Sequence, residues 1–176
     1  AFSIYYLWIK ETLNKRRFNP LSHSPELRLY LILGFLVTAI CTLSLIVTRH
    51  EILLTTGDVL EPSYLNSLRY SAFATISILT TTGYTVAAYE TWPALAIVAL
   101  MAVYLVGGMA GSTSGGMKII RVWIAGKLMI SGIEKIYEPK VVRPIKVGSS
   151  IVPTETRTMV LVFVLFTFLL IGIGSV

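Results

Sequence analysis

Charged residues and cysteines are both scarce in this chain, and each shortage excludes a class of protein. Only 14% of the 176 residues are charged and 55% are hydrophobic, whereas about a quarter of the residues in a soluble domain are charged. A single cysteine, Cys41, leaves no disulfide framework and no cluster of thiol metal ligands. Paired carboxylates and clusters of His, Asp and Glu are also missing, so we predict neither an enzyme nor a covalently bound cofactor.

Long uncharged runs are what the sequence has in place of a polar surface. Residues 29–48 carry no charged side chain, and a helix of that length reaches about 30 Å, the thickness of the hydrocarbon core of a bilayer. Residues 156–176 form another long apolar run. We therefore predict an all-α membrane protein that crosses the bilayer more than once.

The net charge of +6 comes from basic residues that flank the apolar runs. Residues 10–28 hold five Lys and Arg, residues 49–93 hold two, and residues 118–157 hold eight. The positive-inside rule puts the first and third groups in the cytoplasm and residues 49–93 on the outer side. Because the basic residues do not interleave with aromatics on a polar surface, we expect the lipid bilayer as a partner and no nucleic acid.

The chain is organised around a polar stretch that we call the threonine turn, Thr80, Thr81, Thr82, Gly83 and Tyr84. Three β-branched residues before a glycine make a poor helix interior, so we expect irregular or extended backbone whose carbonyls are free to replace the hydration shell of a cation. The apolar residues 66–79 before it would make a helix of about 21 Å, which is too short to span and suits a re-entrant pore helix. An ordinary glycine turn, after a buried or surface helix, is the alternative.

A second unusual stretch, residues 107–118, has five glycines within its first ten residues and is called the glycine loop below. Glycine costs about 1 kcal/mol relative to alanine in a helix, so the loop should break the helix formed by residues 94–106 before a helical pattern resumes at residues 119–137. A phosphate-binding loop is excluded because Met117 separates Gly116 from Lys118. Close helix packing through small residues and a flexible loop across an ion path both remain open.

These stretches together resemble one family. The residues that carry the resemblance are Ser77 to Tyr84, Trp92 and Pro93, Gly107 to Lys118, Arg121, and the helix start from Ser24 to Leu31. They are similar to the third membrane–pore–membrane repeat of the Trk/Ktr/HKT superfamily of potassium transporters, and most closely to TrkH-type uptake subunits of bacteria. The fold then implied is a membrane helix, a re-entrant pore helix with filter, and a broken membrane helix, as in one repeat of a potassium-channel-like pore.

The resemblance implies roles for the two stretches. Residues 80–84 would supply one quarter of a filter that binds potassium, the substrate, through carbonyls. The glycine loop would be an intramembrane gate. Its implied gating residues are Gly107, Gly108, Gly111, Ser112, Thr113, Ser114, Gly115, Gly116 and Lys118.

The resemblance also implies a location and partners. The protein would lie in the bacterial inner membrane as a homodimer, with a cytoplasmic nucleotide-binding regulatory subunit, and take up potassium by symport or channel-like flow.

The expected organisation is one complete repeat at residues 26–137. Residues 1–25 would be the end of an earlier membrane helix and a cytoplasmic loop, residues 138–155 a cytoplasmic connection, and residues 156–176 the first helix of the next repeat. On this interpretation the chain is a fragment that needs the remaining repeats of its parent chain. A subunit of a homotetrameric potassium channel and a non-transporting membrane scaffold are the alternatives.

Overall fold

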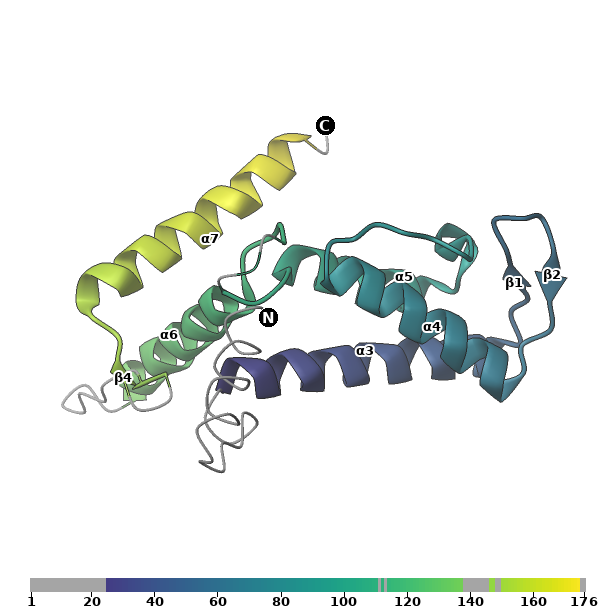
Figure 1. Ribbon diagram of the computed structural model, residues 1–176. Coiled ribbons are helices and arrows are strands. Elements are labelled where there is room, and N and C mark those ends of the chain that lie inside the picture. Colours follow the sequence, from purple (N-terminus) through teal and green to yellow (C-terminus); the bar gives the residue numbers. More distant parts are fainter. Residues whose placement is uncertain (1–24, 111, 113, 138–145, 148–149, 175–176) are drawn as a thin grey trace, which may run out of the picture.

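A computed structural model describes residues 25–110, 112, 114–137, 146–147 and 150–174. The predicted end of an earlier helix and most of the predicted cytoplasmic connection lie outside these residues. The described elements follow one another along the chain as shown in Figure 1. They are α3 (Pro25–Thr48), β1 (Ile52–Leu53), β2 (Val59–Leu60), α4 (Tyr64–Leu79), the 3-10 helix η1 (Tyr89–Thr91), α5 (Ala94–Val106), α6 (Ile119–Tyr137), β3 (Lys146–Val147), β4 (Ser150–Ile151) and α7 (Thr154–Gly174).

The uncharged run predicted to span a membrane lies within α3, and α4 and α5 both pack against this helix. Proline is favourable in the first helical turn, where its missing N–H is not needed, so the helix begins at Pro25. The core between the three helices is apolar. From α3 it contains Val37, Cys41 and Leu45, and from α5 it contains Ala96, Leu100 and Val103.

The helix α4 presents small side chains to that core. It begins two residues before the predicted residue 66, and its 16 residues correspond to about 24 Å, still short of a bilayer core of about 30 Å. Ser67, Ser71 and Thr75 repeat every four residues on its buried face and are fully buried. Among the described residues these three hydroxyls have no hydrogen-bond partner. The face therefore packs by shape, through small groups.

A hairpin closes one end of this three-helix unit. β1 pairs antiparallel with β2, with Ile52 opposite Leu60. Trp92 is only 2% exposed and belongs to the same core cluster as Ile52. Trp92 is thus enclosed where η1 meets α5.

The helix that follows the glycine loop packs mainly with the C-terminal helix. α6 and α7 contact each other through a small cluster of Ile124, Ala125, Val152 and Val160. The guanidinium carbon of Arg121 lies 4.5 Å from the ring centre of Phe163, a cation–π contact between the two helices. Proline at residue 153 precedes the first residue of α7, and the helix begins at Thr154, two residues before the predicted residue 156.

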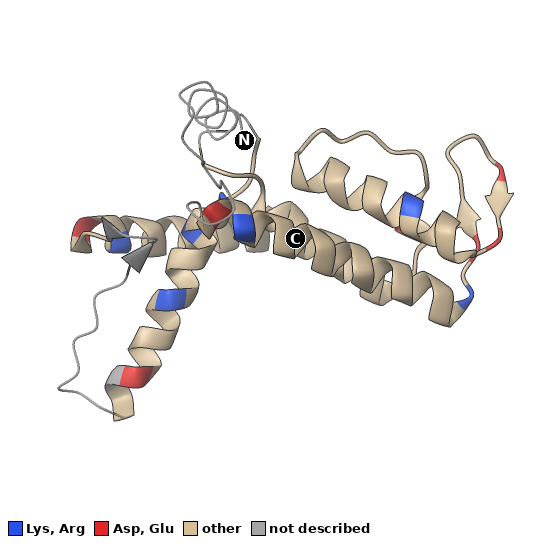
Figure 2. Cartoon of the chain, turned by 60° about the horizontal axis from the view of Figure 1, so that its bottom comes forward, with Lys and Arg blue, Asp and Glu red and all other residues tan. Residues whose placement is uncertain are grey.

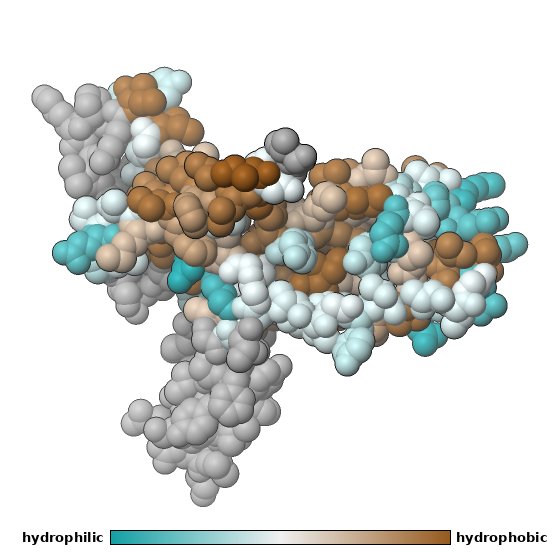
Figure 3. Space-filling view, turned by 90° about the horizontal axis from the view of Figure 1, so that it is seen from above, coloured by the Kyte–Doolittle hydropathy of each residue, from teal (hydrophilic) through white to brown (hydrophobic). Residues whose placement is uncertain are grey.

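Apolar side chains cover the outside of the long helices as well as their inside. α3 and α7 are each long and apolar enough to cross a membrane, and most of their residues are not buried. Figure 2 shows charged residues at the hairpin end and on the other half of the molecule, with the long helices between them mostly uncharged, and Figure 3 shows hydrophobic atoms over the middle of the molecule with hydrophilic atoms gathered at the hairpin end. This distribution is that of a membrane protein, in which lipid or other protein covers the apolar faces.

Candidate functional site

The threonine turn is held at the C-terminal end of α4 by hydrogen bonds that point back into the helix. The amides of Thr80 and Thr81 donate to the carbonyls of Ile76 and Ile78 at 2.9 and 3.0 Å, and the amide of Thr82 donates to the Ser77 carbonyl at 2.9 Å. The helix thus ends at Leu79, directly before the turn, as predicted from the threonine run. Because the free carbonyls of a helix lie at its C-terminal end, the turn sits where the helix dipole favours a cation.

The backbone of the turn is strained at Thr81, and three of its carbonyls accept no hydrogen bond from the described residues. Thr81 has φ of 56° and Gly83 has φ of 78°, and a β-branched residue rarely adopts the left-handed region. Among the residues that the structure describes, none donates a hydrogen bond to the main-chain carbonyls of Thr81, Thr82 or Gly83. Strain of this kind gathers at functional sites. The turn therefore offers a set of unpaired oxygens on an exposed backbone.

One side chain fixes the far end of the turn. The hydroxyl of Ser77, on the last turn of α4, donates to the carbonyl of Tyr84 at 2.7 Å. The hydroxyls of Thr80 and Thr82 lie 2.7 Å apart and share a hydrogen bond. No sequence pattern assigns a partner to the Ser77 hydroxyl, since that partner depends on how the chain turns back over the helix.

After the turn the chain returns to the end of the molecule from which α4 starts. The amide of Thr55 donates to the Val86 carbonyl at 3.0 Å, and the amide of Ala88 donates to the Leu53 carbonyl at 2.9 Å. These bonds attach the returning segment to the β1–β2 hairpin (Figure 1). The helix α4, the threonine turn and the returning segment therefore form a helix–turn–strand-like unit that starts and ends at the β1–β2 hairpin.

The glycine loop interrupts the path from α5 to α6 and closes on itself through glycines. A Cβ on Gly107 would lie 2.3 Å from the Gly115 carbonyl oxygen, and a Cβ on Gly116 would lie 2.7 Å from the Gly107 Cα. Two backbone hydrogen bonds join the ends of the loop, from Met117 to Leu105 at 3.2 Å and from Ile119 to Gly108 at 3.1 Å. The glycines are therefore required for backbone to approach backbone.

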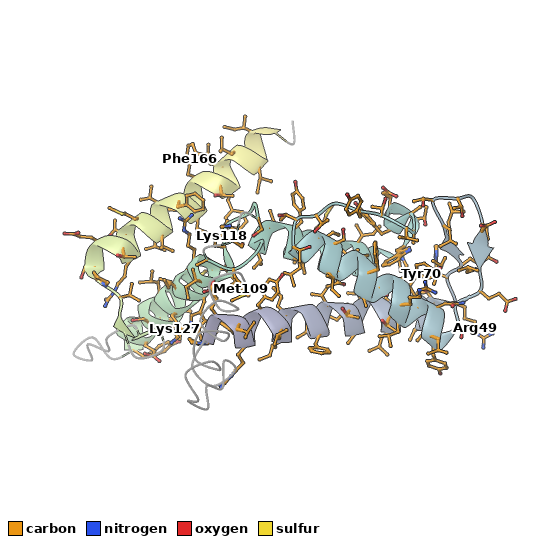
Figure 4. The ribbon with its side chains drawn as sticks, viewed as in Figure 1. Arg49, Tyr70, Met109, Lys118, Lys127 and Phe166 are labelled. Carbon is orange, nitrogen blue, oxygen red and sulfur yellow. The ribbon has the colours of Figure 1, made fainter. Side chains whose placement is uncertain are left out.

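A lysine side chain binds the loop from inside. The Lys118 ammonium donates to the Ser112 carbonyl at 2.8 Å and also to the Ser114 carbonyl, and the Ser112 and Ser114 hydroxyls share a short hydrogen bond. Figure 4 shows Lys118 and Met109 where α5 gives way to α6. Since the ammonium is engaged by the carbonyls of its own loop, the arrangement differs from a phosphate cradle. Gly111 and Thr113, also predicted for this loop, lie outside the described residues.

The loop touches both the threonine turn and the start of α3. The amide of Gly115 donates to the Thr81 hydroxyl at 3.2 Å, and the amide of Ala110 donates to the Glu26 carboxylate. The structure therefore brings together the two stretches that the sequence singled out separately. Within the described residues, no three His, Cys, Asp or Glu side chains gather as they would around a resident metal ion.

Comparisons with known proteins agree with this arrangement. Residues 2–175 match the model of the TrkH family, described as cation transport proteins. The Trk system potassium uptake protein TrkH of Halomonas elongata is 31% identical over an alignment 178 residues long, which covers 98% of this chain and 34% of that protein. TrkH of Escherichia coli K12 is 30% identical over 129 residues, which are 73% of this chain and 25% of that protein.

The fold agrees as well. The crystal structure of the potassium transporter TrkH from Vibrio parahaemolyticus superposes with a TM-score of 0.67 at 31% identity, over 80% of this chain and 28% of that one. The chain spans about a third of the length of the TrkH of Halomonas elongata. A family match over almost the whole chain and a shared fold lead to the same conclusion. The chain belongs to the TrkH family of cation transport proteins.

Proposed function

We propose that this chain supplies one repeat of a potassium-conducting pore and acts within a longer polypeptide that contains further repeats. Two relatives at 31% and 30% identity are potassium uptake proteins, and the chain spans only 34% and 25% of them. On this proposal the threonine turn is one quarter of the selectivity filter. On the same proposal the protein is a transporter and not an enzyme, and potassium is the ion that it transports.

The observation that carries the filter proposal is the set of unpaired carbonyls of Thr81, Thr82 and Gly83. A potassium ion loses its water shell in a filter only if oxygens at fixed positions replace it. Here α4 fixes one end of the turn and the Ser77 hydroxyl fixes the other, at the Tyr84 carbonyl. Tyr84 itself is 72% exposed, which leaves the turn open to the other repeats that a ring of carbonyls needs.

We propose further that the glycine loop is a gate below the filter. The bond between Gly115 and Thr81 supports this, because it holds the loop against the turn on the side where the helix α4 ends. Small side chains leave room for the loop to move aside, and glycine gives it more than one accessible conformation. Helix packing alone would not need the contact with Thr81.

The surroundings of the pore follow from the same proposal. Residues 49–93 face the outside and α6 begins on the cytoplasmic side, in the inner membrane of a bacterium. The homodimer and the nucleotide-binding regulatory subunit remain proposals that rest on the family.

The filter proposal is tested with the variant Gly83→Ser in the full-length protein that carries these residues. A Cβ on Gly83 would meet no atom within 4 Å, so the variant acts through its left-handed φ of 78° and not through a clash. Gly57→Ser is the matched control, because Gly57 has φ of 93°, equally open space, and a place in the β1–β2 turn.

We expect Gly83→Ser to lower the ratio of potassium to sodium uptake, because the strained serine reorients the neighbouring carbonyls. The control should keep the parental ratio. Uptake of both ions is measured per membrane-inserted molecule in cells that lack other potassium uptake systems. Equal ratios in both variants would contradict the assignment of the turn as a filter.

A further inference from the structure

A carboxylate from α3 holds the outer part of the glycine loop. Glu26 lies in the first turn of α3, and its Oε1 accepts a hydrogen bond from the main-chain amide of Ala110, 84 residues further along the chain. The bond joins an ionised group to an amide, and such bonds are stronger than those between neutral groups. It links the start of α3 directly to the loop.

The position of this bond matters because the other described residues of the loop form hydrogen bonds mainly with one another and with the adjoining ends of α5 and α6. Backbone hydrogen bonds close the base of the loop, and Lys118 binds the carbonyls of Ser112 and Ser114 from within. At the described residues of the loop, side chains of two other elements reach its main chain, Thr81 from the threonine turn and Glu26 from α3. Internal bonds fix the shape of the loop, whereas the bonds to Thr81 and Glu26 fix where it lies.

We propose that Glu26 is a positioning residue for ion flow, which keeps the glycine loop in its obstructing position by anchoring Ala110 to α3. This inference rests on the proposal that the loop is a gate. Release of the carboxylate leaves the Ala110 amide free to turn to water, so the loop moves away from the path more often. The bond is exposed to solvent, so its loss shifts the balance of obstructed and open loops by about three- to tenfold.

Three substitutions of Glu26 separate this role from a structural one. E26A removes the acceptor. E26D keeps the negative charge in the first turn of α3, where the helix dipole favours it, but withdraws the oxygens from Ala110. E26Q removes the charge and keeps an oxygen that can accept the bond. E51A is the control, because Glu51 is an exposed carboxylate that follows the other end of α3.

The experiment measures potassium flux per membrane-inserted molecule of the full-length protein, for each variant alone and combined with deletion of residues 112–114. We expect E26A and E26D to raise flux about three- to tenfold, and E26Q and E51A to stay near the parental flux. In the deletion background, where the loop no longer obstructs, E26A and E26D should add nothing, since both changes act on the same element. If E26A inserts poorly into the membrane, the flux of the E26D variant alone tests the proposal.

The outcomes distinguish the two proposals. If the deletion raises flux while E26A and E26D leave it unchanged, the loop is a gate but Glu26 does not position it. If E26D raises flux equally with and without the deletion, Glu26 acts elsewhere and the inference is wrong. If the deletion itself fails to raise flux in well-inserted protein, the gate proposal is refuted, and the inference with it.

Discussion

The closure of the glycine loop on itself gives the sharpest prediction, because one added methyl group should oppose it. In the variant Gly107→Ala the new Cβ would lie 2.3 Å from the Gly115 carbonyl oxygen and 2.9 Å from the Gly116 Cα. Both contacts are with backbone, so no flexible side chain can move aside. Gly107 also has φ of 67° and ψ of −163°, a conformation that is essentially restricted to glycine.

The two effects set the expected size of the loss. A residue forced into such a conformation costs about 1–3 kcal/mol, and overpacking by a methyl group costs about 1–3 kcal/mol more. We therefore expect Gly107→Ala to lower the free energy of unfolding by about 2–6 kcal/mol. Gly115→Ala is the matched control in the same loop, since its Cβ would meet no atom within 4 Å and its φ is not left-handed. It should change stability by less than about 0.5 kcal/mol.

The assay is equilibrium unfolding of the purified full-length protein in mixed detergent micelles, followed by tryptophan fluorescence. Membrane insertion of both variants is measured in parallel. If Gly107→Ala and Gly115→Ala unfold at the same denaturant concentration, the backbone contact between the two ends of the loop does not exist as described. In that case the glycines would serve another purpose.

Two further predictions concern the turn and the orientation of the chain. Ser77→Ala should lower the ratio of potassium to sodium uptake and cost about 1 kcal/mol of stability, because the Tyr84 carbonyl loses its donor. The control Ser71→Ala removes a buried hydroxyl without a described partner and should leave the ratio unchanged. Ion uptake and thermal unfolding check both. In a cysteine-free background, Asp58→Cys should react with an impermeant thiol reagent from outside and Lys127→Cys from the cytoplasm; the reverse pattern would invalidate the orientation inferred from the basic residues.

Hydropathy and helix breakers were enough to predict the helices. The helices at Ala94–Val106 and Ile119–Tyr137 have the bounds expected from the sequence, since the glycines between them leave little doubt about where a helix must stop. The helix α4 begins at Tyr64, two residues before the predicted start at residue 66, with Ser63 as its N-cap residue, a position that the apolar run does not mark. Patterns along the chain thus locate helices well and their first turns less well.

Contacts between distant residues could not be predicted in this way. Glu26 and Ala110 are 84 residues apart, and neither has a sequence context that marks it as a partner of the other. The enclosure of Trp92, which is only 2% exposed, likewise depends on tertiary packing. The Ser77 hydroxyl stood at the edge of the threonine run, yet its bond to Tyr84 exists only because the chain reverses after the turn. The composition of a stretch indicates the type of site, whereas the side chains that hold the site in place depend on the tertiary structure.

The small side chains on the buried face of α4 limit how far the threonine turn can drift. Ser67, Ser71 and Thr75 each have a single side-chain torsion between heavy atoms, whereas leucine has two and methionine three. A contact surface made of such groups has few alternative rotamers, so the helix cannot settle into a second arrangement by repacking its side chains. Thermal fluctuation of the turn along the axis of α4 is then limited by direct contact with α3 and α5. The buried face of α4 therefore limits how far the carbonyls of Thr81, Thr82 and Gly83 can move.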